Sequence, residues 1–272
     1  MLVELVRTYN PKYLFAQKGE HIYPETIERI KTMGVVTLNF YNDQMNQWNV
    51  ISKIAPSYNY FFNECHLVLR RLWSECALTN CFYLAHSAEP LTEDLLVTDK
   101  KYPISFIGTH NKTLYPKRER YLMAIRDLGL NIWGTDGWAA SPLKDCFRGR
   151  SRGEERFAIY ANSKIVIDIN YEFVPAEGVN NRPFEVAGCG TLLVTDYVRK
   201  DLEREYSSGV EVVQFKDEAE LREKVKYYLD HDDERLKVAM AGYRRTVADH
   251  TYDRRVAQIF DTMQHPQNYL FQ

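Results

Sequence analysis

Residues 180–196 read NNRPFEVAGCGTLLVTD and carry the clearest signal in the chain. Two asparagines and an arginine precede a short apolar helical stretch, which ends at Gly190 and continues directly into a strand-like run that closes on Asp196. A helix that only packs against a core needs neither Arg182 nor Glu185 near its start. The segment therefore predicts a binding site at the beginning of a short helix between two strands.

The rest of the chain alternates between short β-branched or aromatic runs and amphipathic segments. Strands are expected at 13–17, 35–40, 58–62, 81–85, 103–108, 130–134, 164–170, 191–196 and 210–215. Helices are expected around Pro24, near 117–128 and near 153–162, and two more are expected to close the chain, the second with Leu236, Met240, Tyr243 and Val247 on one face. Such alternation is typical of an α/β protein with mainly parallel sheets.

Residues 86–102 are polar, show no strand signal and mark the expected domain boundary. We expect a partial N-terminal Rossmann-like domain over 1–95 and a C-terminal Rossmann-like domain over 96–272. Two such domains would face each other across a cleft. In open α/β sheets, ligands bind beyond the carboxyl ends of the strands, so candidate site residues should follow strands directly.

The composition excludes several classes of protein. The 35 basic and 37 acidic side chains give a net charge of −2, so no basic excess favours nucleic acid. Five cysteines form no close pairs of the zinc-binding kind and are expected to be reduced thiols. The chain holds neither a signal-peptide pattern nor 18 consecutive apolar residues, which favours a cytoplasmic protein without a transmembrane segment.

Two glutamates flank the start of the quoted helix. Glu177 precedes it and Glu185 lies on it, with seven residues between them. A carboxylate suits a pair of vicinal sugar hydroxyls, whereas the Arg182 guanidinium and backbone N–H groups suit phosphate. Together they indicate a nucleotide sugar. An ordinary helix capped by Asn181, with Pro183 in its first turn, explains the same residues equally well. Because Arg182 lies in the first turn of the helix, its side chain is also expected to be partly exposed.

Other candidates also follow expected strands. Gly108 ends the expected strand 103–108 and Arg118 follows it, where a ligand phosphate could be held, although a solvated loop accounts for them at least as well. Asp43 and His86 follow strands of the first half and could contact an acceptor, although a lone histidine is more often structural.

As a block, three motifs resemble one known family. They are RPFEVAGCGTLLVTD at 182–196, HTY at 250–252, and PISFIGTH at 103–110 with Arg118 behind it. They resemble the C-terminal domain of GT-B glycosyltransferases, in particular the group typified by the spore maturation protein CgeB. The resemblance covers residues 101–262 well and 10–100 loosely.

The resemblance implies a sugar transfer from a nucleoside-diphosphate sugar to an unknown glycan, protein or small-molecule acceptor, without an essential metal or other cofactor. Glu185 would hold the ribose, Arg118 and Arg182 the diphosphate, and Glu177 the transferred sugar as the catalytic residue. A glutamate pair at this spacing is typical of retaining members. The nucleotide-sugar site is therefore expected to contain Gly108, Arg118, Asn180, Asn181, Arg182 and Glu185.

Only about four strands precede the expected domain boundary, which is few for a GT-B N-terminal domain. The first half is therefore expected to be short or truncated, and a partner could cover the edge of its sheet. This leaves an alternative open, a non-catalytic nucleotide-sugar-binding module or an enzyme fragment lacking part of its acceptor domain. A nicotinamide-dependent oxidoreductase would need GxGxxG after the first strand, and the sequence has none there.

Overall fold

The computed structural model describes residues 1–151, 153–171, 177–197 and 199–270. Contacts divide the chain into two compact units. The N-terminal unit contains Met1–His86, Glu177–Val179 and Asp253–Gln272, and the C-terminal unit contains Ser87–Ala176 and Asn180–Tyr252. The expected domains were 1–95 and 96–272. In the structure the first segment ends at residue 86, and residues 177–179 and 253–272 group with it.

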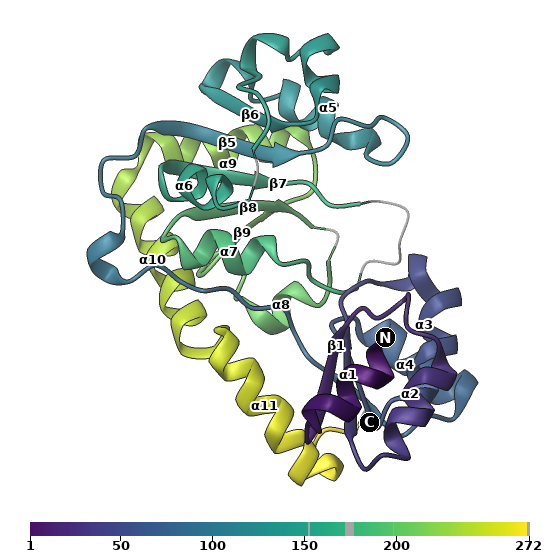
Figure 1. Ribbon diagram of the computed structural model, residues 1–272. Helices are drawn as coiled ribbons and strands as arrows, with labels where there is room; N and C mark the ends of the chain where they lie inside the picture. The colour runs from purple at the N-terminus through teal and green to yellow at the C-terminus, as the bar shows by residue number, and fades with distance from the viewer. Residues whose placement is uncertain (152, 172–176, 198, 271–272) are drawn as a thin grey trace. The chain divides into compact units, whose positions relative to one another are not determined.

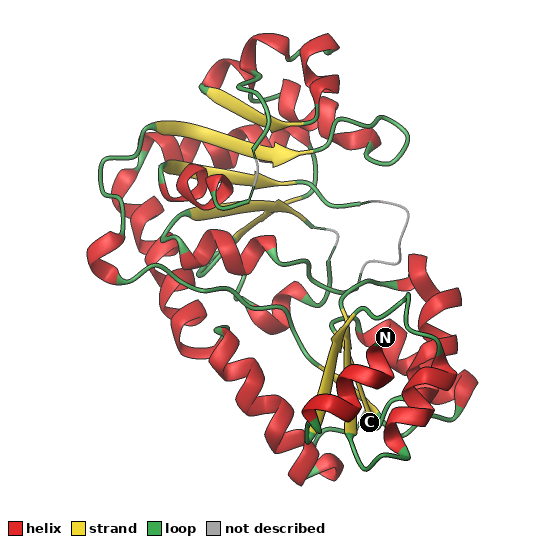
Figure 2. Ribbon diagram, in the orientation of Figure 1, coloured by secondary structure: helices red, strands yellow, loops and turns green. Residues whose placement is uncertain are grey.

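The N-terminal unit is built on a four-stranded parallel sheet in the order β1-β2-β3-β4 (Figures 1 and 2). Its strands are β1 (Tyr13–Gln17), β2 (Val36–Tyr41), β3 (Tyr60–Asn63) and β4 (Cys81–Tyr83). Its first helices are α1 (Leu2–Tyr9), α2 (Pro24–Lys31), α3 (Trp48–Ile54) and α4 (His66–Cys76). Helix α2 starts at its proline, whose ring fixes a helical φ and whose missing N–H is not needed there.

Successive side chains of each strand reach opposite faces of this sheet. Phe61 of β3 packs with Ile27, Ile51 and Leu69 from α2, α3 and α4. Its neighbour Phe62 packs on the other face with Leu38, Phe82 and Ile259. Ile259 belongs to α11 (Tyr252–Gln264), a third closing helix where the sequence predicted two. The last helix of the chain therefore completes the core of the first unit.

The C-terminal unit contains a five-stranded parallel sheet in the order β6-β5-β7-β8-β9. Its strands are β5 (Tyr102–Gly108), β6 (Leu130–Gly134), β7 (Ser163–Asp168), β8 (Leu192–Asp196) and β9 (Val213–Phe215). The chain runs from β5 to one side and returns to β7 on the other. The strand order therefore reverses between β5 and β7, the kind of switch point where open α/β sheets bind ligands.

Helices cover both faces of this sheet (Figure 1). On one face lie α6 (Glu155–Ala161), α7 (Arg182–Gly188) and α10 (Asp232–Asp249), and on the other α5 (Pro116–Met123) and α9 (Glu218–Asp230). A short helix, α8 (Leu202–Glu205), precedes β9. Across the chain, 3-10 turns occupy Met45–Gln47, Ala55–Ser57, Glu93–Leu95, Arg126–Leu128, Asp136–Ala140, Lys144–Cys146 and Pro266–Asn268.

Helix α10 buries only part of the expected face, on which Tyr243 is 4% exposed. Leu236 and Val247 are both 43% exposed, whereas Ala239, Gly242 and Thr246 are buried. The reason is close packing, since a Cβ atom on Gly242 would lie 2.5 Å from the carbonyl oxygen of Glu211. Gly242 permits this close approach of the backbone, and Leu236 and Val247 lie at the surface.

The predicted α/β class with two parallel sheets is confirmed. In the part of the chain that the structure describes, none of the helices combines the length and the hydropathy that crossing a membrane requires.

Candidate functional site

Arg118 joins the two strands at the switch point of the C-terminal unit. Its side chain comes from α5 and is 6% exposed. Its Nε and Nη2 donate to the carbonyl oxygen of Ile169, at 3.2 and 3.1 Å, and Nη1 donates to that of Thr109 at 2.9 Å. Burial, and secondly the charge of Arg182, lower the pKa of Arg118 to about 10. Within the described residues, these bonds use three of its five N–H groups.

Gly108 ends β5 beside this guanidinium. A Cβ atom there would lie 2.7 Å from the ring of Phe106 and 3.2 Å from Nη1 of Arg118. The carbonyl oxygen of Gly108 accepts a hydrogen bond from Trp138 Nε1 at 2.8 Å. Packing therefore requires glycine at this position, and a side chain would displace Arg118. A ligand contact at Gly108 stays a prediction.

Arg182 forms a buried ion pair with Asp168 at the end of β7. Its Nη1 donates to Asp168 Oδ1, and its Nε donates to Tyr160 Oη at 3.4 Å. The side chain of Arg182 is 19% exposed and that of Asp168 1%, so the expected partial exposure of Arg182 is slight. Burial lowers the pKa of Arg182, but the charges and hydrogen bonds of Asp168 and Tyr160 together outweigh burial and raise that pKa. The other carboxylate oxygen, Asp168 Oδ2, is buried and has no partner among the described residues.

Glu185 lies on α7 and is 7% exposed. Its Oε1 accepts hydrogen bonds from Arg156 Nη2 at 2.9 Å and Asn181 Nδ2 at 2.6 Å. Burial raises the pKa of Glu185, and the charges of Arg156 and Arg182 oppose that rise. Arg156 comes from α6 and is absent from the expected site. In the sequence, Arg156 is one of the polar residues of an ordinary amphipathic helix, so nothing marked it as a site residue.

The two asparagines before α7 act differently from the expected cap. Asn181 bonds to Glu185, and it is Asn180 Oδ1 that accepts the backbone N–H of Arg182 at 2.9 Å. Asn180 Nδ2 in turn donates to Asn170 Oδ1 at 2.9 Å, and Asn170 Nδ2 donates to Asp196 Oδ1 at 2.7 Å. This chain of bonds ties the start of α7 to the carboxyl ends of β7 and β8.

Asp196 ends the quoted segment as a buried carboxyl, 2% exposed. Burial raises its pKa to about 6, although hydrogen bonds from Asn170 act in the opposite direction. Arg118, Arg182, Glu185, Asp168 and Asp196 thus form one charged cluster at the carboxyl ends of β5, β7 and β8. The C-terminal unit brings together every residue expected to bind the nucleotide sugar.

Glu177 belongs to the N-terminal unit, whereas Glu185 belongs to the C-terminal unit. The two carboxylate oxygens of Glu177 accept hydrogen bonds from Arg70 Nη2 at 2.5 and 2.6 Å, and the side chain of Glu177 is 18% exposed. Arg70 lies on α4 and was not a sequence candidate. The expected pair of glutamates is therefore divided between the two units.

The two acceptor-side candidates also lie in the N-terminal unit. Asp43 follows β2 and pairs with Lys18 Nζ at 2.6 Å. His86 follows β4, and its ring meets that of Phe40 edge-on with centroids 5.6 Å apart. Burial, and then the charge of Arg255, lower the pKa of His86 to about 4. The imidazole is therefore neutral at pH 7, and an acceptor role stays a prediction for both residues.

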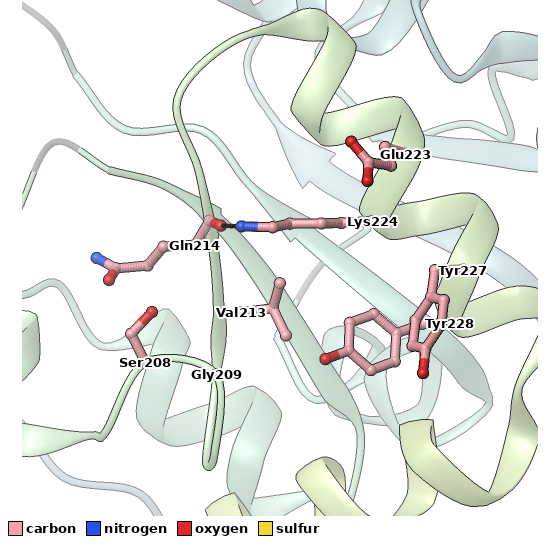
Figure 3. A pocket seen from close by; sticks show the side chains of 8 residues that line it. All are labelled: Ser208, Gly209, Val213, Gln214, Glu223, Lys224, Tyr227 and Tyr228. Atoms are coloured by element: carbon pink, nitrogen blue, oxygen red, sulfur yellow. Dashed lines mark hydrogen bonds between the residues drawn. The ribbon is translucent and has the colours of Figure 1, made fainter.

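A hollow of about 280 Å³ lies elsewhere, against the edge strand β9 (Figure 3). Val213, Tyr227 and Tyr228 line it together with Lys224, whose Nζ donates to the carbonyl oxygen of Gln214 at 2.6 Å. The amide of Gln214 points away from Lys224 and the tyrosines, and neither of its polar atoms has a partner in the described part of the chain. None of the expected site residues lines this hollow.

No group of three or more histidine, cysteine, aspartate or glutamate side chains within the described ranges is arranged to hold a metal ion. Metal independence of the reaction stays a prediction.

Solved structures of other proteins have a similar fold. Sucrose-phosphate synthase from Thermosynechococcus elongatus superposes with a TM-score of 0.68 at 13% identity, over 98% of this chain and 76% of that one. The pneumococcal O-GlcNAc transferase GtfA, solved with UDP and GlcNAc, gives 0.66 at 11% identity, over 97% and 59%. Anabaena HepE, solved with UDP and glucose, gives 0.63 at 12% identity, over 97% and 80%. The fold is that of GT-B glycosyltransferases, as the sequence predicted.

A family model described as glycosyl transferase-like matches residues 117–261, more than half of the chain. The chain belongs to this family. Spore protein CgeB of Bacillus subtilis (strain 168) is 31% identical over 80 residues, which make up 29% of this chain. The matched segment spans 23% of the spore protein's length.

Proposed function

We propose that the protein is a glycosyltransferase that moves a sugar from a nucleoside-diphosphate sugar to an acceptor. The observation that carries this proposal is the charged cluster at the switch point of the C-terminal unit. Arg118, Arg182 and Glu185 lie within the residues that the family model matches. Relatives of the same fold were solved with UDP and a sugar, which supports the same class of donor here.

In this proposal Arg118 and Arg182 bind the diphosphate. Arg118 has N–H groups beyond those used by Ile169 and Thr109, and it lies at the strand ends where ligands of open sheets bind. Arg182 is held by Asp168, so it acts as a fixed positive charge. Preorganised cations of this kind stabilise the charge that develops on a departing diphosphate.

Glu185 is assigned to the ribose hydroxyls. Its carboxylate is held by Arg156 and Asn181, and its second oxygen can accept from a sugar hydroxyl. Glu177 is assigned to the transferred sugar in a retaining reaction that needs no metal ion. Asp43 and His86 are assigned to the acceptor.

Calorimetry with UDP, GDP, ADP and TDP and their sugar conjugates tests the donor site. We expect at least one conjugate to bind below millimolar. Glu185→Gln is expected to weaken a nucleoside diphosphate by about 10-fold, the loss of one charge-assisted hydrogen bond, and to leave inorganic pyrophosphate unaffected. Glu223→Gln, an exposed glutamate beside the hollow at β9, is the matched control. Absence of binding by every nucleotide would refute the proposal.

Turnover measured with EDTA tests the mechanism. We expect donor hydrolysis or transfer to continue in the chelator, because the proposal gives the phosphate charge to arginines. Activity that EDTA abolishes and manganese restores would contradict the metal-free assignment while leaving the donor site in place.

A further inference from the structure

Arg70 lies on α4 (His66–Cys76) of the N-terminal unit and holds both oxygens of Glu177 through one nitrogen. The bonds of 2.5 and 2.6 Å join residues 107 positions apart in the sequence. The Glu177 side chain is 18% exposed, and the Arg70 side chain is 42% exposed. Both groups are charged, and a charge-assisted hydrogen bond is stronger than one between neutral groups.

The residues next to Glu177 pack tightly within the same unit. Gly178 has φ +82°, and a Cβ atom there would lie 2.8 Å from Gln44 Nε2 and 3.1 Å from Cys65 Cβ. Val179 is 3% exposed. The segment 177–179 is therefore seated by its glycine and its valine, and Arg70 fixes the carboxylate at its start.

We propose that Arg70 is a positioning residue for the transfer reaction, which sets the place and orientation of the Glu177 carboxylate. This rests on the proposed function, in which Glu177 acts on the transferred sugar. Arg70 acts only through Glu177 and is given no contact with the donor. A carboxylate displaced by about 1 Å can cost on the order of 100-fold in rate, so such an anchor is catalytically relevant.

The same helix offers a matched control. Arg71, the next residue, forms an equivalent two-bond pair with Glu75, from Nε at 2.6 Å and Nη2 at 2.8 Å. That pair is exposed and stays within α4. Arg70→Ala and Arg71→Ala therefore each remove an arginine and its carboxylate bonds from one helix, and only the first removes the bonds to Glu177. Arg71→Ala also removes a cation–π contact with the Trp48 ring at 4.1 Å. Arg70→Lys restores a positive charge.

The first measurement is hydrogen exchange on the purified full chain without any donor. We expect faster exchange in a peptide covering 177–185 for Arg70→Ala, wild-type exchange for Arg71→Ala, and partial recovery for Arg70→Lys. The second is steady-state kinetics with a nucleotide sugar that the wild type turns over. We expect Arg70→Ala to lower kcat by about 10- to 100-fold with the donor KM within about threefold, and Arg70→Lys to regain part of kcat.

Unchanged hydrogen exchange in Arg70→Ala would show that Arg70 does not hold Glu177 in place. Faster exchange with an unchanged kcat would overturn the positioning role, and an equal loss of kcat in Arg71→Ala would attribute the effect to α4 itself. A wild-type protein that turns over no nucleotide sugar refutes the proposed function and with it the positioning role, and the exchange measurement then tests only the anchoring of 177–179.

Discussion

The substitution Arg182→Ala is expected to destabilise the fold as well as the donor site. The guanidinium is the ion-pair partner of Asp168, whose side chain is 1% exposed at the end of β7. Removing it leaves a buried carboxylate without its counter-charge. Water cannot replace the arginine at a position so shielded, so the charge is left uncompensated.

The size of the loss follows from these contacts. Breaking a buried ion pair by removing one partner costs about 3–5 kcal/mol, and the hydrogen bond to Tyr160 adds about 1 kcal/mol at most. Because 19% of the Arg182 side chain is exposed, we expect the lower part of this range, about 3–4 kcal/mol. At roughly 2–4 °C for each kcal/mol, the melting temperature should fall by roughly 6–16 °C.

Urea unfolding measures this loss of stability in wild type, Arg182→Ala, Asp168→Asn and the double variant. The double variant should be more stable than Arg182→Ala, because it buries no charge at this position. Arg150→Ala, which removes an exposed partner of Asp136, is the control and should lose about 1 kcal/mol or less. If Arg182→Ala unfolds within about 1 kcal/mol of wild type, the buried-pair reasoning is wrong.

Three further predictions concern stability in the C-terminal unit. Gln214→Leu should raise the free energy of unfolding by about 1–2 kcal/mol in urea titrations, because it removes two buried polar atoms without partners among the described residues, and a loss would show that the amide is satisfied. Gly242→Ala should lower it by about 1–3 kcal/mol through collision with the Glu211 carbonyl, and an unchanged melting temperature would contradict that packing. Asp196, with a pKa of about 6 in the fold, keeps a proton that the unfolded chain releases, so its contribution to stability is lost as pH rises through 6. Relative to wild type, Asp196→Asn should therefore gain about 1 kcal/mol between pH 5 and 7.5, and a change of opposite sign would refute the assignment.

Local patterns were sufficient to predict the strands. Runs such as YLFAQ and LNIWG became β1 and β6 with the expected bounds, because short apolar and aromatic runs favour strands. The nucleotide-sugar candidates were also predictable, since parallel strands place the residues that follow them at a common edge. Arg118, Arg182 and Glu185 meet there for that reason.

Partners that come from distant parts of the chain could not be predicted. Asp168 ends the apolar strand β7, and nothing local indicated that Arg182 would pair with it. Arg156 and Arg70 lie on ordinary amphipathic helices and reach their glutamates only through tertiary packing. Two residues expected on the buried face of α10, Leu236 and Val247, are exposed for the same reason, because the close backbone contact at Gly242 comes from a distant part of the chain.

The position of α11 has a consequence for biosynthesis. A ribosome makes residues 1–86 before residues 253–272, yet Ile259 of the later segment packs with Leu38, Phe62 and Phe82 of the first sheet. While the C-terminal unit is being synthesised, this aromatic face of the nascent chain has no covering helix. The first unit to be translated is thus the last to complete its core, and until then its exposed phenylalanines are a surface on which chaperones can bind or neighbouring chains can aggregate.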